Sequence, residues 1–395
     1  MKSSHRGKVL ITDANSRKGL AAVRSLGRRG LRVIAGHDQP HALTFASRFC
    51  TGRLLYPSPK KSPEEFLVFM LEHLRTERYD CFIPMGDEVI ELVARHREEF
   101  AELANIVVVD GETMDVAMDK GRTIEFARAH GFGHPRTFFV EDLSKLEPLR
   151  DQIPYPVVIK PRVGSGAHGL IFVERPEEFL AQYRRVHQRY PFPLIQEAIP
   201  LSSPKFGVQC LFNRQGQVRA AVVQRFWRQY PLKGGPGSCF ETVNRPDIQD
   251  CGVRLMETLG WRGVAQVEFL EDERDGELKL MEINPRFWDS LQTVIQAGVD
   301  FPYLLYRIAT EGDVEPHMDY RFGEICRSML PGEILYFLAS GRRWRMEPSF
   351  WRFRGPNLGY SVWSRNDVRP AFAHLRFALK SLFDREMRDV VFRRL

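Results

Sequence analysis

The fold is decided by the stretch Leu280-Met281-Glu282-Ile283-Asn284-Pro285-Arg286. Polar and apolar residues alternate along it, so a β-strand places the side chains of Glu282 and Asn284 on one face. An upstream run, Val264-Ala265-Gln266-Val267-Glu268-Phe269-Leu270, alternates in the same way. The polar stretch 271–276 between the two runs is typical of a hairpin connection. The sequence therefore predicts an antiparallel hairpin with polar groups on one face.

Two glutamates of this hairpin should face each other. Glu268 and Glu282 are equally far from Asp275, so a regular register places their Cβ atoms about 5 Å apart. Like charges at that distance repel unless a cation lies between them. Two carboxylates and the amide oxygen of Asn284 suit Mg²⁺, which takes few protein ligands and keeps positions for water and phosphate. An exposed acidic hairpin is the alternative, but it does not explain the order Asn284-Pro285-Arg286.

A second pattern lies upstream of the hairpin. The apolar run 155–159 ends at Lys160, and a flexible loop follows, Val163-Gly164-Ser165-Gly166-Ala167-His168-Gly169. Glycines let backbone N–H groups approach phosphate oxygens, and the lysine adds a positive charge. The loop is not a Walker A motif, because no Gly-Lys-Ser/Thr follows and 170–173 reads as a strand. A plain hairpin turn is the alternative, but the lysine before the loop and the carboxylates after it favour a phosphate-binding loop.

Together these motifs resemble the ATP-grasp superfamily, whose second ATP-binding subdomain ends in a Glu-x-Asn-x-Arg strand preceded by an isolated metal-binding Glu. The resemblance covers roughly 9–313, and its specificity comes from the order of the signals. It implies that Lys120, at the start of a predicted helix, reaches the nucleotide phosphates; alone, Lys120 would read as a surface lysine. It also implies that 194–200 links two subdomains and that backbone groups near Glu197 and Ile199 read adenine.

The resemblance implies a site in three parts. The metal, Mg²⁺ or in its place Mn²⁺, would be held by Glu268, Glu282 and Asn284. The nucleotide would contact Lys120, Lys160, Gly164, Ser165, Gly166, His168, Gly169, Gln196, Glu197, Ala198 and Ile199. The catalytic groups would be Arg286 on the transferring phosphoryl group, Lys160 on a phosphate, and Arg225.

A third pattern contains Arg225. Together with Arg228 it precedes a glycine-rich loop, 230–238. In the functional interpretation this loop closes over the substrate while the arginines bind carboxylate or phosphate; in the alternative it is a surface turn with solvated charge. Because the family carries substrate-facing residues in this neighbourhood, the resemblance favours the functional interpretation.

Composition limits the class of protein. A chain of 395 residues has room for more than one domain, and 43% hydrophobic with 27% charged residues is typical of globular proteins. The six cysteines form no Cys-x-x-Cys pair, which argues against structural zinc or a disulfide framework and favours a reducing cytoplasm. The run after 1–8 is too short for a signal sequence, and no apolar segment is long enough to span a bilayer.

Positive charge is concentrated near the C-terminus. Residues 321–395 carry 14 Arg and one Lys against seven acidic residues, a net charge of +8, so 1–320 sum to −1. Such a segment attracts nucleic acid, anionic lipid or an acidic partner, but Arg scattered among Trp and Phe is more often a partly packed surface. We therefore expect no nucleic-acid partner, and leave peripheral membrane contact and the oligomeric state open.

The predicted fold class is α/β. Residues 8–36 read as strand, helix and strand, a βαβ opening that lacks Gly-x-Gly-x-x-Gly and so predicts no dinucleotide site. Arg48, Asp87 and Glu88 follow predicted strands, at loop positions where open α/β sheets hold ligands. A helix cap or a surface role is the alternative for each of them. The resemblance implies a Rossmann-like pre-ATP-grasp domain over 1–115, a first ATP-grasp subdomain over 116–195, a second over 196–320, and a basic, aromatic C-terminal extension over 321–395.

The resemblance implies ADP-forming ligation, in which a carboxylate attacks the γ-phosphate of ATP and an amine then attacks the acylphosphate. The pattern 21–30 with Ser47-Arg48 is similar to the branch that includes D-aspartate ligase and short relatives of carbamoyl-phosphate synthase. This favours an amino acid or peptide-like substrate. Two alternatives stay open: a bicarbonate-phosphorylating carboxylase or carbamoyl-phosphate-type enzyme, and a non-catalytic ATP-binding scaffold with a basic docking tail. Residues 202–207 lack an acidic group found in many relatives, which leaves ribose recognition open.

Overall fold

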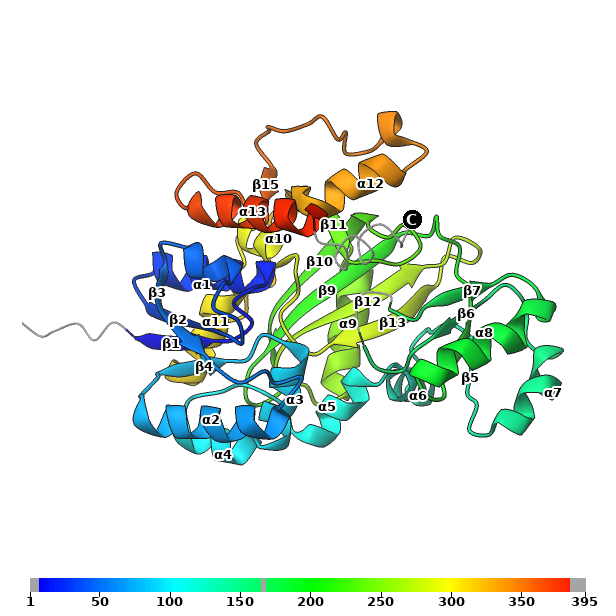
Figure 1. The fold of residues 1–395 in the computed structure, drawn as a ribbon, viewed down its shortest axis with the longest axis horizontal. Helices are drawn as coiled ribbons and strands as arrows, with labels where there is room; N and C mark the ends of the chain where they lie inside the picture. Colours follow the sequence, from blue (N-terminus) through cyan, green and yellow to red (C-terminus); the bar gives the residue numbers. More distant parts are fainter. Residues whose placement is uncertain (1–6, 165–167, 384–395) are drawn as a thin grey trace, which may run out of the picture.

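The computed structural model describes residues 7–164 and 168–383. In these residues the strands form three sheets, which lie next to one another across the molecule in Figure 1. The α/β fold class is therefore confirmed. No helix of the described residues combines the length and the apolar character needed to cross a membrane.

The first sheet is parallel and lies in the N-terminal part of the chain. Its strand order is β3-β2-β1-β4. The strands are β1 Lys8–Ile11, β2 Arg32–His37, β3 Cys50–Leu55 and β4 Cys81–Ile83. The helices are α1 Arg17–Arg28, α2 Pro63–Thr76, α3 Asp87–Arg95, α4 Arg97–Leu103 and α5 Gly111–Met118, with a 3-10 turn η1 at Leu43–Ala46. The βαβ opening is confirmed, since β1 and β2 pair in parallel and α1 connects them along the chain.

The second sheet carries the predicted phosphate loop. Its strand order is β5-β8-β6-β7, and all three pairings are antiparallel. The strands are β5 Thr137–Phe138, β6 Val157–Lys160, β7 Ile171–Val173 and β8 Leu194–Glu197. The helices are α6 Lys120–Ala129, η2 Leu143–Lys145, α7 Leu146–Arg150 and α8 Pro176–Arg189. Strand β6 ends at Lys160, as predicted, and the glycine-rich loop connects it to β7.

The large sheet has the order β13-β12-β9-β10-β11-β14-β15. Its strands are β9 Lys205–Phe212, β10 Val218–Gln229, β11 Gly237–Thr242, β12 Gly263–Glu271, β13 Leu278–Asn284, β14 Ile325–Arg327 and β15 Leu358–Tyr360. Its helices are α9 Pro246–Thr258, α10 Leu291–Gln296 and α11 Phe301–Glu311. Alternate side chains of β9, β10 and β12, such as Val208, Val223 and Val267, are buried in one core with α9.

The C-terminal segment crosses the molecule from the large sheet to the N-terminal part, along the top of Figure 1. It contains the π-helix η3 Met329–Glu333, α12 Ile334–Ala339, η4 Arg343–Arg345 and α13 Arg369–Phe383. The expected boundaries cut across these sheets: 195/196 falls inside β8, and 320/321 separates β14 and β15 from the sheet they complete. Strand pairing, which the local pattern does not show, carries the large sheet beyond residue 320.

Buried ion pairs hold both ends of this segment. Glu333 is fully buried and accepts hydrogen bonds from Arg228 of β10 (Nε–Oε1 2.7 Å) and from Arg327 of β14 (Nε–Oε2 2.9 Å). At the other end, buried Asp367 accepts from Arg24 Nε of α1 at 2.9 Å. Breaking a buried ion pair is strongly destabilising, so these contacts fix the path of the segment.

Candidate active site

The carboxylate hairpin has the predicted register. Strands β12 and β13 pair antiparallel, with Glu268 opposite Glu282 and Gln266 opposite Asn284. The amide nitrogen of Asn284 lies 3.2 Å from Glu268 Oε1, 3.4 Å from Glu282 Oε1 and 3.3 Å from Gln266 Oε1. The predicted facing carboxylates are thus confirmed, and the Asn284 side chain lies between them.

Three lysines from three different elements surround these carboxylates. Lys120, the first residue of α6, places Nζ 3.3 Å from Glu282 Oε2 and donates to the carbonyl oxygen of Gly164 at 2.6 Å. Lys205, the first residue of β9, lies 2.6 Å from Glu268 Oε2. Lys160, buried at the end of β6, lies 3.5 Å from the carbonyl oxygen of Met281. Five ionisable groups therefore meet where the two ATP-grasp subdomains are expected to face each other.

Three ammonium groups face two carboxylates in this cluster, and burial and these close charges shift their pKa values. Burial lowers the pKa of Lys160 to about 7, and the neighbouring Lys120 adds to the effect. Burial opposes ionisation of Glu282, but the surrounding lysines outweigh it and lower the pKa of this carboxyl to about 2. Burial also acts against the charge of Lys205, yet Glu268 and Glu282 raise its pKa. An anion would relieve the crowding of the three ammonium groups.

The cluster lies in a cleft with a volume of about 940 Å³. Most of the predicted site residues line it: Lys120, Lys160, Gly164, His168, Gln196, Glu197, Ile199, Arg225, Glu268, Glu282, Asn284 and Arg286. Gly169 and Ala198 lie beside the cleft and are not among its lining residues. The predicted contacts at Ser165 and Gly166 lie outside the described residues. A cleft of this size has room for a nucleotide and a second small molecule.

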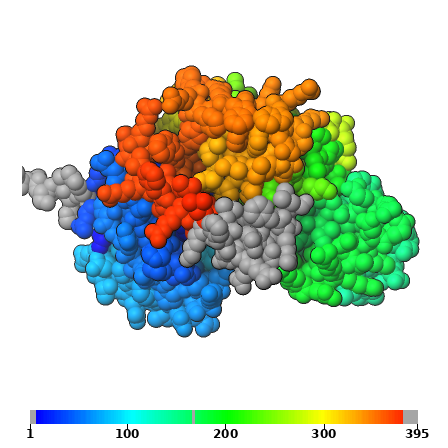
Figure 2. Space-filling view, turned by 45° about the horizontal axis from the view of Figure 1, so that its top comes forward, coloured from blue at the N-terminus to red at the C-terminus, as the bar shows by residue number. Residues whose placement is uncertain are grey.

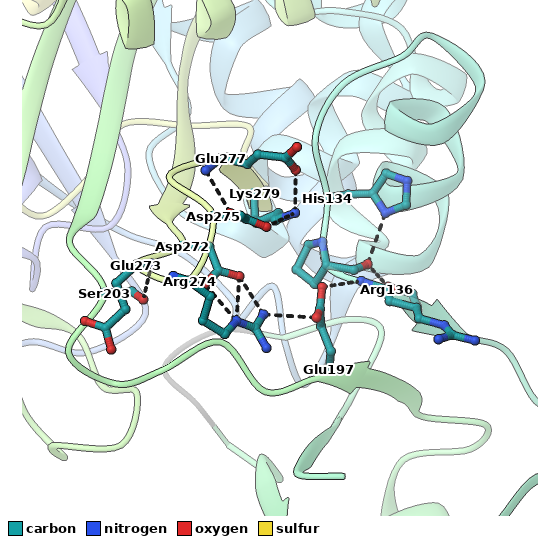
Figure 3. Close-up of polar contacts among 12 residues, drawn as sticks. His134, Arg136, Glu197, Ser203, Asp272, Glu273, Arg274, Asp275, Glu277 and Lys279 are labelled. Atoms are coloured by element: carbon teal, nitrogen blue, oxygen red, sulfur yellow. Dashed lines mark hydrogen bonds and ion pairs between the residues drawn. The ribbon is translucent and has the colours of Figure 1, made fainter. Parts of the chain in front are cut away.

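The linker after β8 is held from both sides. Glu197 accepts from the backbone N–H of Arg136 at 2.8 Å and from Arg274 Nη2 at 3.0 Å, so its carboxylate ties the linker to the β12–β13 turn (Figure 3). The Ala198 N–H donates to Pro156 O at 3.1 Å. Ile199 is buried, and its N–H has no acceptor within the described residues. The side chain of Glu197 is thus structural, while Ile199 lines the cleft and has no acceptor for its N–H in the described parts of the chain.

Arg286 is held by the N-terminal part of the chain. Its Nε lies 2.5 Å from Asp87 Oδ1, and its Nη1 donates to Phe287 O at 3.1 Å. Asp87 is the first residue of α3, and it also lines the cleft. The sequence left open whether Asp87 contacts a ligand or caps a helix. The structure adds another role, because the Asp87 carboxylate orients Arg286.

The glycine-rich loop after β10 reaches across the cleft. Lys233 places Nζ 5.8 Å from the ring centre of Phe172 on β7, and residues 232–237 line the cleft. Arg225 lies over the ring of Trp227 at 4.0 Å and faces the cleft without a carboxylate partner in the described residues. The hypothesis that Arg228 binds a substrate anion is wrong in this structure, because Glu333 and the carbonyl oxygen of Pro348 take up its guanidinium.

Sequence reasoning missed two features of the cleft. The only signal at Lys205 was that residues 202–207 lack the acidic group found in many relatives. The positive charge of Lys205 itself gave no prediction. Tyr336, Ser340 and Arg342 of the C-terminal segment also line the cleft. Their only signal was the basic and aromatic composition of that segment, which says nothing about where it packs.

Comparison with known proteins identifies the class. Residues 117–290 match the family model of the ATP-grasp domain. This stretch of the chain is therefore an ATP-grasp domain.

Individual relatives are distant. D-aspartate ligase of Enterococcus faecium is 26% identical over 284 residues, 65% of this chain and 66% of that protein. Acetyl-CoA carboxylase of Saccharomyces cerevisiae is 28% identical over 165 residues, 40% of this chain and 7% of that protein. The chain thus spans less than two thirds of the length of either relative.

Solved structures share the fold. The biotin carboxylase domain of Hydrogenobacter thermophilus 2-oxoglutarate carboxylase, solved with MgADP and bicarbonate, superposes with a TM-score of 0.68 at 17% identity, over 81% of this chain and 73% of that one. An L-amino acid ligase of Bacillus licheniformis gives a TM-score of 0.61 at 18% identity, over 78% and 75%. The likeness extends well beyond the residues matched by the family model.

Proposed function

We propose that the chain is an ADP-forming carboxylate–amine ligase that works through an acylphosphate. The observation that carries this proposal is the cluster of Lys120, Lys160 and Lys205 around Glu268 and Glu282. Three cations beside two carboxylates provide for both a polyphosphate and the metal that accompanies it. The match of residues 117–290 to the ATP-grasp domain and the similarity to D-aspartate ligase support the same reaction class.

The nucleotide is ATP, and its two ends are bound by different groups. The adenine lies against the linker after β8, where the N–H of Ile199 donates to a ring nitrogen. The triphosphate lies against Lys120, Lys160 and the glycine loop around Gly164. Both lysines are close to Glu282, so each lysine lies between a negatively charged phosphate and a carboxylate.

The residues present fit a magnesium ion. Glu268 and Glu282 offer carboxylate oxygens from adjacent strands, and a half-turn of the Asn284 amide presents its oxygen to the same place. Within residues 7–164 and 168–383 no three His, Cys, Asp or Glu side chains form a fuller set. This donor set suits a hard ion that completes its coordination with phosphate and water. When bound, Mg²⁺ (or Mn²⁺) neutralises charge on the transferred phosphoryl group.

The chemistry needs positioning more than covalent participation by the protein. An oxygen of the substrate carboxylate attacks the γ-phosphorus and ADP leaves. The amine then attacks the acyl carbon, and phosphate leaves as the amine loses a proton. Arg286, oriented by Asp87, stabilises the transferring phosphoryl group, and Arg225, which also lines the cleft, binds the substrate carboxylate.

The arrangement of the sheets supports a division of the chain into domains. We assign residues up to about 115 to a Rossmann-like pre-ATP-grasp domain, 116–197 to the first ATP-grasp subdomain and the large sheet to the second. The C-terminal segment adds β14 and β15 to that sheet and a wall to the cleft. Free thiols at all six cysteines agree with a reducing compartment, and we retain the cytoplasm as the proposed location.

Release of ADP and phosphate across a panel of amino acids, dipeptides and amines tests this function. Release that needs both a carboxylate and an amine, with an amide found by mass spectrometry, is the expected result. Bicarbonate belongs in the panel, because the neighbouring biotin carboxylase domain was solved with it. Release with bicarbonate alone would instead establish the carboxylase-type reaction. Binding of MgATP without release for any pair would leave the scaffold function.

A further inference from the structure

The C-terminal segment exposes both apolar and basic side chains. Its apolar members are strongly exposed: Trp344 is 74% exposed, Trp351 56%, Leu338 55% and Phe353 45%. Exposed arginines lie among them in the sequence. We call this the Trp–Arg surface, and it consists of Ile334, Leu338, Arg342, Trp344, Arg345, Trp351, Arg352, Phe353 and Arg354. The segment is orange to orange-red and forms the top of the molecule in Figure 2.

The rings of this surface form one packed cluster. Trp344 and Trp351 stack with centroids 6.1 Å apart and planes at 15°. Phe337 meets both of them edge to face, at 5.4 Å and 5.8 Å. Phe350 and Phe353 extend the cluster, and the guanidinium of Arg327 lies 5.5 Å from the ring of Phe350. Aromatic pairs of this kind hold a fixed arrangement, so the exposed rings belong to a built surface.

The base of the cluster is anchored in the protein core. Arg327 and Arg228 are buried and share Glu333, immediately before α12. The two arginines also bind carbonyl oxygens below the rings, at Pro348 for Arg228 and at Phe350 and Arg352 for Arg327. Exposure of the rings is therefore a property of a docked segment and does not result from fraying.

The charge of the surface is unbalanced. Residues 334–366 contain six arginines and a single acidic residue, Glu347. In the described parts of the chain, Arg342, Arg345, Arg352 and Arg354 form no ion pair. Unpaired arginines around exposed tryptophans are complementary to an anionic surface that has an apolar interior.

We propose that the Trp–Arg surface binds the face of an anionic lipid bilayer. Tryptophan rings settle at the headgroup level, the aliphatic side chains of Ile334 and Leu338 enter the acyl boundary, and the arginines meet lipid phosphates. Single-stranded nucleic acid fits less well, because it would stack on the rings and leave the exposed Ile334 and Leu338 without an apolar partner. A second copy of the chain would bring two basic faces together, which like charges oppose.

This orientation has a consequence for the cleft. Tyr336, Ser340 and Arg342 line the cleft, and they belong to the same short stretch as the exposed Leu338 and Trp344. A protein docked through this surface would hold the cleft mouth next to the bilayer. The docking proposal itself rests on the surface alone and holds whichever reaction the cleft performs.

Co-sedimentation of the full chain with lipid vesicles tests the proposal. We expect binding to vesicles of phosphatidylcholine with phosphatidylglycerol, weak binding to pure phosphatidylcholine, and loss of binding at about 1 M salt, where the screening length falls to about 3 Å. The double variant Trp344→Ser/Trp351→Ser should bind at least about tenfold more weakly, because each ring leaves water on docking. Arg352→Glu/Arg354→Glu should lose binding to anionic vesicles.

Matched controls separate docking from general stickiness. Val68→Ser removes an equally exposed apolar group from α2, and Lys60→Glu/Lys61→Glu reverses exposed charge far along the chain from the Trp–Arg surface. Both controls should bind like the wild type. The proposal is overturned if the wild type ignores anionic vesicles, or if the Trp and Arg variants bind as it does. It is equally overturned if the wild type forms a dimer that Trp344→Ser/Trp351→Ser abolishes. Binding of single-stranded DNA but not of vesicles through these residues would also overturn it.

Discussion

Glu333→Gln is the most informative change to the framework that carries the site. Glu333 is fully buried, and both of its carboxylate oxygens bind arginines, Arg228 and Arg327, at 2.7 to 2.9 Å. The glutamine keeps the shape but leaves two buried guanidinium groups without a counterion. Breaking one buried pair costs about 3–5 kcal/mol, and repulsion between the two remaining cations adds to that. We therefore expect a loss of at least about 3 kcal/mol in the free energy of unfolding.

Urea denaturation, followed by circular dichroism, measures this loss. Trypsin digestion under native conditions adds a local readout, since release of the C-terminal segment exposes the bond after Arg327, which is buried in the intact protein, to cleavage. The matched control is Glu311→Gln, which breaks the exposed pair with Arg307 and should cost only about 0.3–0.5 kcal/mol. A Glu333→Gln protein within about 0.5 kcal/mol of the wild type, with unchanged digestion, would refute the view that this charge cluster holds the segment in place.

Four further predictions concern the charge cluster in the cleft. Glu282→Gln removes one charge at constant shape, so turnover should fall about 10²–10³-fold with unchanged thermal unfolding, and a wild-type rate would contradict the metal assignment. Lys160→Met should weaken MgATP binding in calorimetry far more than adenosine binding; equal losses would indicate a folding role. Burial lowers the pKa of Lys160 to about 7, so its ammonium group loses a proton as the pH rises through neutrality. The ATP affinity of the wild type should therefore fall between about pH 6 and about pH 8, while that of Lys160→Met should not change with pH. Lys205→Met frees an oxygen of Glu268, so nucleotide-free protein should bind Mn²⁺ more tightly by electron paramagnetic resonance, and unchanged affinity would argue against a competing ammonium.

The parts of the site that the sequence predicted are those with a local pattern. Glu268 and Glu282 could be paired because alternation and a short turn fix the register of a hairpin. Lys160 could be placed because it ends an apolar run. Such inferences need only neighbouring residues, so the hairpin, the loop and the βαβ opening were all within reach.

The parts that the sequence did not predict depend on distant partners. Lys205 meets Glu268 from 63 residues away, and Arg286 meets Asp87 across 199 residues. Arg228 was interpreted as a ligand of substrate, but the partner that decides its role, Glu333, lies 105 residues further on. The local sequence does not distinguish an arginine that binds a substrate anion from one that is paired with a carboxylate of the same chain.

The ion pair between Arg24 and Asp367 bears on the time at which the protein matures during synthesis. These residues lie 343 positions apart, and Arg24 is buried when Asp367 is in place. A nascent chain must therefore expose Arg24 to water until nearly all of the protein has left the ribosome. A chain that ends before residue 367 lacks the carboxylate that neutralises Arg24, so α1 could not bury this guanidinium in its native place without leaving a charge unpaired.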